Sequence, residues 1–189
     1  MMRMAIADRH NTLTDVLRWS QAGVDMVQLR DKSLDAGELC RLAVAWRQAL
    51  WASATRLVIN GRVDVAMAAR ADGVHLTSRQ GELTPKQVRR LMPGAFVSVS
   101  THTIDEVTRA VHAGADLILF GPVFEKRVAG EVVQSGVGLP TLSAACRLAG
   151  KLPVLALGGV TAQNAAACMQ AGAAGIAGIR LFAASCVRK

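Results

Sequence analysis

Apolar residues along this chain fall into short runs that recur after similar turns. The phrase Ala-Gly-Val-Asp-Met-Val-Gln-Leu at 22–29 returns as Ala-Arg-Ala-Asp-Gly-Val-His-Leu at 69–76, and as Ala-Gly-Ala-Asp-Leu-Ile-Leu-Phe at 113–120. A looser copy occupies 171–178. Glycine after the last apolar turn is typical of a helix end, because it takes positive φ without a Cβ clash. An apolar run without alternation is typical of a strand covered on both faces. Each copy therefore predicts a helix end, a turn and a buried strand.

Followed from end to end, the same pattern predicts strands and helices in alternation. Strands are expected over 4–8, 25–30, 56–60, 73–76, 96–100, 116–121, 153–157 and 174–179. Helices are expected over 13–22, 34–52, 63–69, 85–92, 104–113, 140–149 and 162–171, and a long glycine-containing loop of the kind that forms lids over 122–138.

Eight strands joined by right-handed crossovers close into a barrel. The predicted fold class is therefore α/β, a small (β/α)8 TIM barrel. Its last helix is expected to be short or missing, because only about ten residues follow the last strand. An open doubly wound sheet is the alternative.

Composition places the chain among globular proteins. Its 189 residues favour a single domain over 1–189, and 51% hydrophobic residues suffice for a core. No apolar run approaches the roughly 20 residues of a membrane span, and the first ten residues show no signal-peptide centre. The four cysteines are scattered without metal-ligand spacing, which is typical of reduced thiols. A cytoplasmic protein without a membrane partner is expected.

The net charge of +8 favours anionic partners. The basic residues are dispersed along the predicted helices, and aromatic residues make up only 4% of the chain. Nucleic-acid binding usually needs clustered Lys and Arg with stacking aromatics, so nucleic acid is not expected as a partner. The charge instead favours a pocket for small phosphorylated molecules.

In a barrel of this kind, chemistry is expected where the strands end. Strand alternation places Gln28 and Arg30 on one side, with Lys32 just beyond them. An amide and two cations at a barrel mouth are costly to desolvate unless an anion is bound, so these residues are candidates for anion binding. The alternative is an Arg30 paired with Asp8 or Asp31 and a solvated lysine.

The third, fourth and fifth strands end in further polar residues. Asn60 precedes a glycine that would allow a ligand to approach the backbone, although Asn-Gly is also ordinary turn chemistry. His75 ends the fourth strand, and Ser100 and His102 lie at the end of the fifth. A histidine at a strand end can act as an acid or base near neutral pH, or it can be structural.

Glycines follow the last two strands, and an acid follows the sixth. Gly158 and Gly159 are expected to open a helix and present backbone N–H groups to an anion, with Gly178 and Ile179 beside them. Glu125 could act as a general base if it is partly desolvated, or it could be paired on the surface.

In order along the chain, several of these motifs resemble the thiamine phosphate synthase and TenI superfamily. The motifs are Gln28-x-Arg30-x-Lys32, Val58-Ile59-Asn60, Asp72-Gly73-Val74-His75-Leu76, Ser98-Val99-Ser100-Thr101-His102-Thr103, Gly121-Pro122-Val123-Phe124 and Leu157-Gly158-Gly159. The resemblance covers nearly the whole chain. It implies a (β/α)8 barrel, in agreement with the pattern, and small-molecule phosphate ligands.

Within this superfamily, the synthases join a pyrimidine diphosphate to a thiazole phosphate and use Mg²⁺. The resemblance places the two metal-binding carboxylates of the synthases at Gly61 and Gln80, neither of which can replace a carboxylate on a hard cation. The Thr-x-Thr-Lys pyrophosphate loop is replaced by the residues at 125–128. No metal and no cofactor are therefore expected.

Three other phrases resemble TenI, a thiazole tautomerase that moves a proton on a thiazole carboxylate phosphate. They are Asn60-Gly61-Arg62-Val63-Asp64, Thr84-Pro85-Lys86-Gln87-Val88-Arg89 and Phe120-Gly121-x-Val123-Phe124-Glu125. The resemblance predicts a tautomerase, an isomerase of thiamine biosynthesis, with its substrate held by the residues named above. Because Pro122 stands where TenI has its catalytic histidine, His102 or Glu125 is expected to move the proton.

Two alternatives stay open at this stage. One is a thiamine phosphate synthase whose metal ligands are displaced, and the other is a non-catalytic module that retains only the phosphate-binding residues. An incomplete last helix would also expose apolar surface that a second copy of the chain could cover, as in a homodimer.

Overall fold

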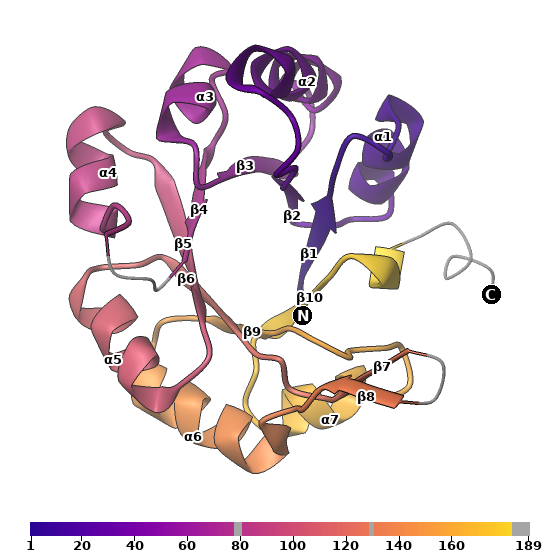
Figure 1. The fold of residues 1–189 in the computed structure, drawn as a ribbon, viewed down its shortest axis with the longest axis vertical. Helices are drawn as coiled ribbons and strands as arrows, with labels where there is room; N and C mark the ends of the chain where they lie inside the picture. Colours follow the sequence, from indigo (N-terminus) through magenta and orange to yellow (C-terminus); the bar gives the residue numbers. More distant parts are fainter. Residues whose placement is uncertain (78–80, 129–130, 183–189) are drawn as a thin grey trace.

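A closed barrel of eight parallel strands forms the centre of the molecule (Figure 1). The computed structural model describes residues 1–77, 81–128 and 131–182. The barrel strands neighbour one another in the order β1-β10-β9-β6-β5-β4-β3-β2, which confirms the predicted (β/α)8 fold. Their bounds are β1 Met2–Ala7, β2 Met26–Leu29, β3 Arg56–Asn60, β4 Gly73–Leu76, β5 Phe96–Thr101, β6 Leu117–Phe120, β9 Val154–Ala156 and β10 Gly175–Gly178.

Helices surround the barrel on its outside (Figure 1). They are α1 Leu13–Gln21, α2 Ala36–Ala49, α3 Val63–Ala68, α4 Pro85–Leu91, α5 Ile104–His112, α6 Gly138–Ala149 and α7 Ala165–Gln170. A capping box at Thr84 begins α4. At α5, Thr103 accepts from the Glu106 N–H, and the Glu106 carboxylate accepts from the His102 N–H. None of the helices in the described part of the chain is long and apolar enough to cross a membrane.

The predicted loop over 122–138 was wrong in part, because it contains an antiparallel ribbon of β7 Lys126–Val128 and β8 Glu131–Gln134 outside the barrel. The two strands have only three and four residues and no polar-apolar alternation, so the sequence pattern did not reveal them. After the last barrel strand comes the 3₁₀ turn η1 Arg180–Phe182, and 183–189, on which the expected length of the last helix depends, lie outside the described residues.

The repeated phrase found in the sequence has a structural explanation. In three copies the aspartate precedes an even-numbered strand and accepts the backbone N–H of a residue in the preceding barrel strand. Asp25 accepts from Arg3 at 2.7 Å, Asp72 from Leu57 at 2.8 Å and Asp116 from Val97 at 2.8 Å. The carboxylates therefore hold neighbouring strands together at the N-terminal end of the barrel, opposite the end where chemistry is expected.

Two different surfaces line the barrel interior. A closed apolar cluster fills one side and contains Met4, Ile6, Met26, Leu117, Leu119, Leu155 and Ala177. Strand register points polar side chains from β2 to β5 into the other side. We call these five residues the polar arc: Gln28, Asn60, His75, Ser98 and Ser100. The main core lies between the strands and the helices, where Trp46 and Phe120 are fully buried.

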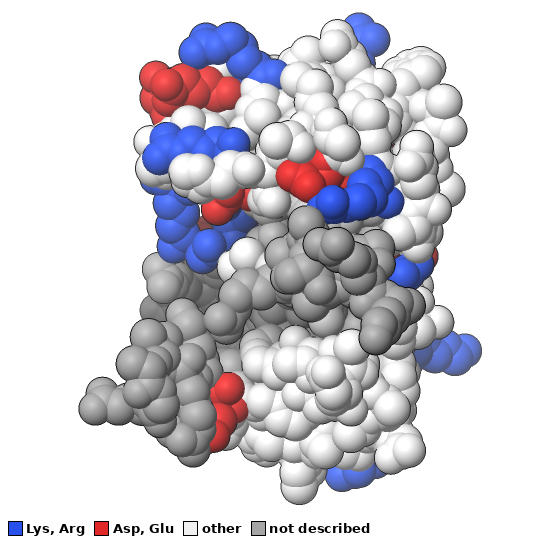
Figure 2. All heavy atoms as spheres, turned by 90° about the vertical axis from the view of Figure 1, so that its right-hand side faces the viewer, with Lys and Arg blue, Asp and Glu red and all other residues white. Residues whose placement is uncertain are grey.

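The basic residues are spread over the surface. On the face that Figure 2 shows, Lys and Arg form several separate groups, some of them beside Asp or Glu, and white surface lies between them. The described cysteines are free: Cys40 and Cys146 are partly buried and Cys168 is buried. Burial raises the pKa of the Cys146 and Cys168 thiols, which keeps them protonated.

Candidate functional site

The polar arc begins with two amides on neighbouring strands. Gln28 in β2 donates from Nε2 to Oδ1 of Asn60 in β3 at 3.3 Å. Gln28 is only 1% exposed, and its Oε1 has no hydrogen-bond partner among the described residues. Because buried polar atoms are normally paired, this open acceptor is a position where a ligand or water can donate.

His75 is the titratable residue of the polar arc, and its side chain is buried. Its Nδ1 lies 2.8 Å from Ser98 Oγ and its Nε2 lies 2.7 Å from Ser100 Oγ. Burial, and to a smaller extent the nearby Arg30 guanidinium, lowers the pKa of His75 to about 3. The imidazole is therefore neutral near pH 7, so His75 is not a cation that binds phosphate.

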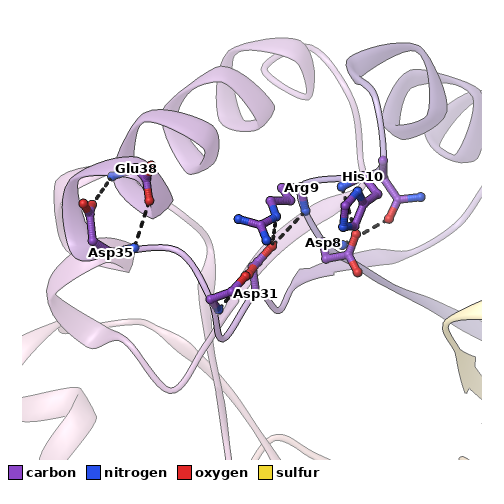
Figure 3. Close-up of polar contacts among 8 residues, drawn as sticks. Asp8, Arg9, His10, Asp31, Asp35 and Glu38 are labelled. Carbon is purple, nitrogen blue, oxygen red and sulfur yellow. Dashed lines mark hydrogen bonds and ion pairs between the residues drawn. The ribbon is translucent and has the colours of Figure 1, made fainter.

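Arg30 and Lys32 follow β2 and have exposed side chains. The alternative of an Arg30 paired with Asp8 or Asp31 is not what the structure shows. Asp31 instead accepts from the backbone N–H of Arg9 at 3.2 Å, and the Arg9 guanidinium is its ion-pair partner at 3.7 Å (Figure 3). Neither Arg30 nor Lys32 forms an ion pair with an acid of the described chain.

Asp31 and Asp8 are used in loop structure beside these cations. Asp31 accepts from both the N–H and the hydroxyl of Ser33, and these bonds, with those from Arg9, lower the pKa of Asp31 to about 2. Asp8 accepts from the backbone N–H of His10 at 2.9 Å (Figure 3). Both carboxylates are therefore engaged within the loops, and the positive charge of Arg30 and Lys32 is left for an anion.

His102 and Glu125 lie outside the polar arc, and both are exposed. The Nδ1 atom of His102 contacts the backbone carbonyl oxygen of Gly121. Glu125 directly precedes β7. The structure therefore joins Gln28 to Asn60 and Ser100 to His75, whereas the imidazole of His102 contacts the loop after β6.

The Gly158-Gly159 turn was expected to open a helix, and this was wrong. The next helix, α7, begins only at Ala165, and both glycines have positive φ, of 87° and 65°. A Cβ at Gly158 would lie 2.5 Å from the Cα of Pro122. The glycines are thus needed because another segment of the chain packs directly against the turn, a reason that local sequence does not reveal.

The turn still presents backbone donors. No carbonyl or side chain in the described part of the chain accepts from the N–H groups of Gly158, Gly159 or Val160. Beside it, Gly178 ends β10, and Ile179 is 59% exposed. Consecutive unpaired N–H groups at a barrel mouth suit an anion such as a phosphate.

Comparison with known proteins identifies the family to which this barrel belongs. The family model described as "Thiamine monophosphate synthase" matches residues 3–182, so the chain belongs to this family. A relative named thiamine-phosphate synthase from Methanocella arvoryzae is 40% identical over 88% of this chain and 77% of its own. One of the same name from Methanoculleus marisnigri is 39% identical over 89% and 79%.

A solved structure extends the match to three dimensions. Thiamine phosphate pyrophosphorylase from Pyrococcus furiosus superposes with a TM-score of 0.84 at 26% identity, covering 98% of this chain and 89% of its own. The names of these relatives support an enzyme of thiamine biosynthesis that acts on small phosphorylated molecules.

The expectation of a thiazole tautomerase was wrong. Relatives that are 36–40% identical over most of the chain are named thiamine-phosphate synthase. The matched structure is named thiamine phosphate pyrophosphorylase. The expectation rested on a few positions, above all Gly61, where a carboxylate is missing. The proton-transfer roles of His102 and Glu125 were derived from that reaction and lose their basis with it.

Proposed function

We propose that this chain is a thiamine-phosphate synthase. The reaction joins the exocyclic methylene carbon of a pyrimidine diphosphate to the ring nitrogen of a thiazole phosphate. The carbon–oxygen bond to the diphosphate breaks, and pyrophosphate leaves with that electron pair. The thiazole nitrogen supplies the electron pair of the new bond and becomes a cationic ring nitrogen. The nucleophile carries no proton, so the protein needs no general base to activate it.

The observation that carries the proposal is the pair of cations, Arg30 and Lys32, that follow β2 beside the polar arc and have no acidic ion-pair partner among the described residues. Arg30 and Lys32 can neutralise the charge that develops on the departing pyrophosphate, and such charge stabilisation is a large contribution in group transfer. Their loop is held by Asp31, whose bonds to Arg9 and Ser33 fix the chain between the two cations. The cations are thus positioned without being neutralised.

The remaining site residues have matching roles. Gln28, Asn60 and Ser100 would bind polar atoms of the diphosphate substrate, since they line the polar arc next to Arg30. The phosphate of the thiazole would bind the backbone N–H groups after Leu157 and those at Gly178 and Ile179. Phosphate binding at loops after the seventh and eighth barrel strands is common in this fold.

The residues present do not fit the Mg²⁺ that the family resemblance implies. At the end of β3, Gly61 has no side chain, and a Cβ there would meet nothing within 4 Å. Nearby Asp64 is already bound by the Arg62 guanidinium. No group of three or more His, Cys, Asp or Glu in the described segments could hold a metal ion, and Gln80 lies outside those segments. No step is therefore assigned to a metal held by these side chains.

A steady-state assay of the purified protein with both substrates tests the proposal. Thiamine phosphate should form faster than in buffer alone. Arg30→Ala and Lys32→Ala should each lower kcat/KM by about ten-fold or more, since each removes a charge-assisted contact. The matched control is Arg70→Ala. This variant removes an exposed arginine that follows the C-terminal end of α3, and it should leave kcat/KM unchanged. Tight binding of both substrates without product would overturn the proposal.

A further inference from the structure

His75 lies between two serines that differ in their access to solvent. Ser98 and Ser100 are two residues apart in β5, so both side chains point to the same face of the strand, toward His75 in β4. Ser98 is 0% exposed, whereas Ser100 is only partly buried. The chain Ser98–His75–Ser100 therefore runs from the closed interior of the barrel to a position with access to solvent.

Hydrogen-bond accounting fixes the direction of the protons along this chain. The hydroxyl of Ser98 has one partner in the described residues, the Nδ1 atom of His75 at 2.8 Å. If Nδ1 carried the imidazole proton, it would donate to Ser98, and the Ser98 proton would have no acceptor. A buried donor without a partner is costly enough to shift a tautomer ratio by about ten-fold or more. Ser98 therefore donates to Nδ1, and the imidazole proton is on Nε2.

This tautomer determines what Ser100 can do. The Nε2–H of His75 donates to Ser100 Oγ at 2.7 Å, so the Ser100 hydroxyl acts as acceptor on that side. Its own proton is then free to point away from the imidazole. The opposite tautomer would have Ser100 donate to Nε2, leaving only lone pairs for a ligand, and lone pairs repel an anion.

The imidazole must stay neutral for this arrangement, because a protonated ring would donate to both serines. Burial and the Arg30 guanidinium lower the pKa of His75 to about 3, so the ring is neutral across the physiological range. The parallel register of β2, β3 and β4 puts Arg30, which directly follows Leu29, level with Asn60 and His75, so Arg30 and Ser100 belong to the same end of the barrel.

We propose that Ser98 and His75 are positioning residues that turn the Ser100 hydroxyl proton toward the anionic group bound at Arg30. The identification of that group as the substrate diphosphate rests on the proposed function. Neither Ser98 nor His75 needs to touch the substrate. Ser98 fixes the tautomer of the His75 ring, and the ring in turn orients the hydroxyl of the partly exposed Ser100.

The tautomer itself is tested on the wild-type protein. Long-range proton–nitrogen NMR spectra of selectively labelled histidine distinguish a proton on Nε2 from one on Nδ1. The expected result is a neutral His75 with its proton on Nε2, and no change in that pattern from pH 5 to pH 8. A proton on Nδ1, or a charged ring at neutral pH, would overturn the proposal without requiring any variant to fold.

The consequence for anion binding is tested by calorimetric titration with inorganic pyrophosphate, which does not require turnover. Ser100→Ala should weaken binding by about ten-fold, the loss expected for one hydrogen bond to a charged group. Ser98→Ala should weaken it by about three-fold or more, because the tautomer preference is removed, and Ser98→Thr should restore binding. In the double variant, Ser98→Ala should have no further effect, since it acts only through Ser100.

Thr101→Val is the matched control, because Thr101 is in the same strand and its buried hydroxyl has no partner among the described residues. It should leave pyrophosphate binding unchanged. Additive effects of Ser98→Ala and Ser100→Ala, or equal losses in Ser98→Ala and Thr101→Val, would contradict a positioning role. If pyrophosphate binding follows the proposal but no thiamine phosphate forms, the proposed function fails while the positioning role stands.

Discussion

The carboxylate of Asp31 joins two loops at the barrel mouth by accepting from the backbone N–H of Arg9 at 3.2 Å (Figure 3). Asp31 also accepts from Ser33, and its side chain is only 5% exposed. We expect Asp31→Asn to lower the free energy of unfolding by about 1–3 kcal/mol, because the bonds that it loses involve a buried charge. Denaturant unfolding of both proteins measures this difference.

Asp64→Asn serves as the control for that substitution. Asp64 is paired with Arg62, but its side chain is 64% exposed, so water screens the pair. We expect a loss below about 1 kcal/mol in the free energy of unfolding. Equal losses for the two variants would show that Asp31 does not hold the loops together.

The buried His75 should make the protein less stable as the pH falls. The pKa of this group is about 3 in the folded chain against 6.5 for an ordinary histidine. Between these values the unfolded chain binds a proton that the folded chain does not, so stability falls from about pH 6.5 toward pH 3. Thermal unfolding at pH 7 and pH 4.5 should show the decrease.

His75→Asn should remove this component of the pH dependence, although the variant should be less stable at pH 7 because it loses two hydrogen bonds. Asp31 acts in a separate, lower window. Its pKa is lowered from 3.8 to about 2, so its contribution is present above pH 4 and is lost as the pH falls toward 2. If the stability of His75→Asn fell as steeply as that of the wild type between pH 7 and pH 4.5, His75 would not be the source of the decrease.

Gly158→Ala should be more destabilising than an alanine at another left-handed glycine. A Cβ at Gly158 would lie 2.5 Å from backbone and side-chain atoms of Pro122, whereas one at Gly94 would meet nothing within 4 Å. Both glycines have positive φ, so both variants include the same backbone strain of about 1–2 kcal/mol. Overpacking should add about 1–3 kcal/mol at Gly158 alone. Matching midpoints of unfolding for the two variants would contradict the close packing seen here.

Metal binding should be weak in the free protein. Calorimetric titration at about 1 mM Mg²⁺ should show no saturable binding, because hard cations need several oxygen ligands and the end of β3 offers Gly61 instead of a carboxylate. Gly61→Asp should raise the Mg²⁺ affinity, and Gly61→Asn, which has the same shape without the charge, should not. A Cβ at this position would meet no atom within 4 Å, and the left-handed φ of 68° strains both variants alike, a conformation that Asp and Asn adopt more readily than most residues. Saturable binding by the wild type would show that other ligands are present.

The barrel could be predicted from the sequence because its signal is periodic. Each copy of the repeated phrase combines a helix end with a buried strand, and the structure adds that the aspartate of three copies binds the preceding strand. The β7–β8 ribbon was missed because it is short and packs outside the barrel. The start of α7 was misplaced because two glycines resemble a helix opening, while their real requirement is contact with Pro122.

The candidate site was predictable only in part. The sequence named Gln28 and Asn60 as separate candidates at the ends of two strands, and the parallel register of β2 and β3 is what brings the two amides into contact. The environment of His75 was not predictable, because it depends on Ser98 and Ser100 from another strand. The reaction was predicted wrongly because missing carboxylates at two positions outweighed similarity over the whole chain.

The most direct test of the central claim is a single-turnover reaction of excess protein with the pyrimidine diphosphate and thiazole phosphate. Thiamine phosphate and pyrophosphate are quantified from the same quenched samples. We expect the two products to appear in equal amounts and at the same rate, with a slower common rate in Arg30→Ala. Bound substrates that stay unchanged, or pyrophosphate released without thiamine phosphate, would contradict the assignment of this barrel as a synthase.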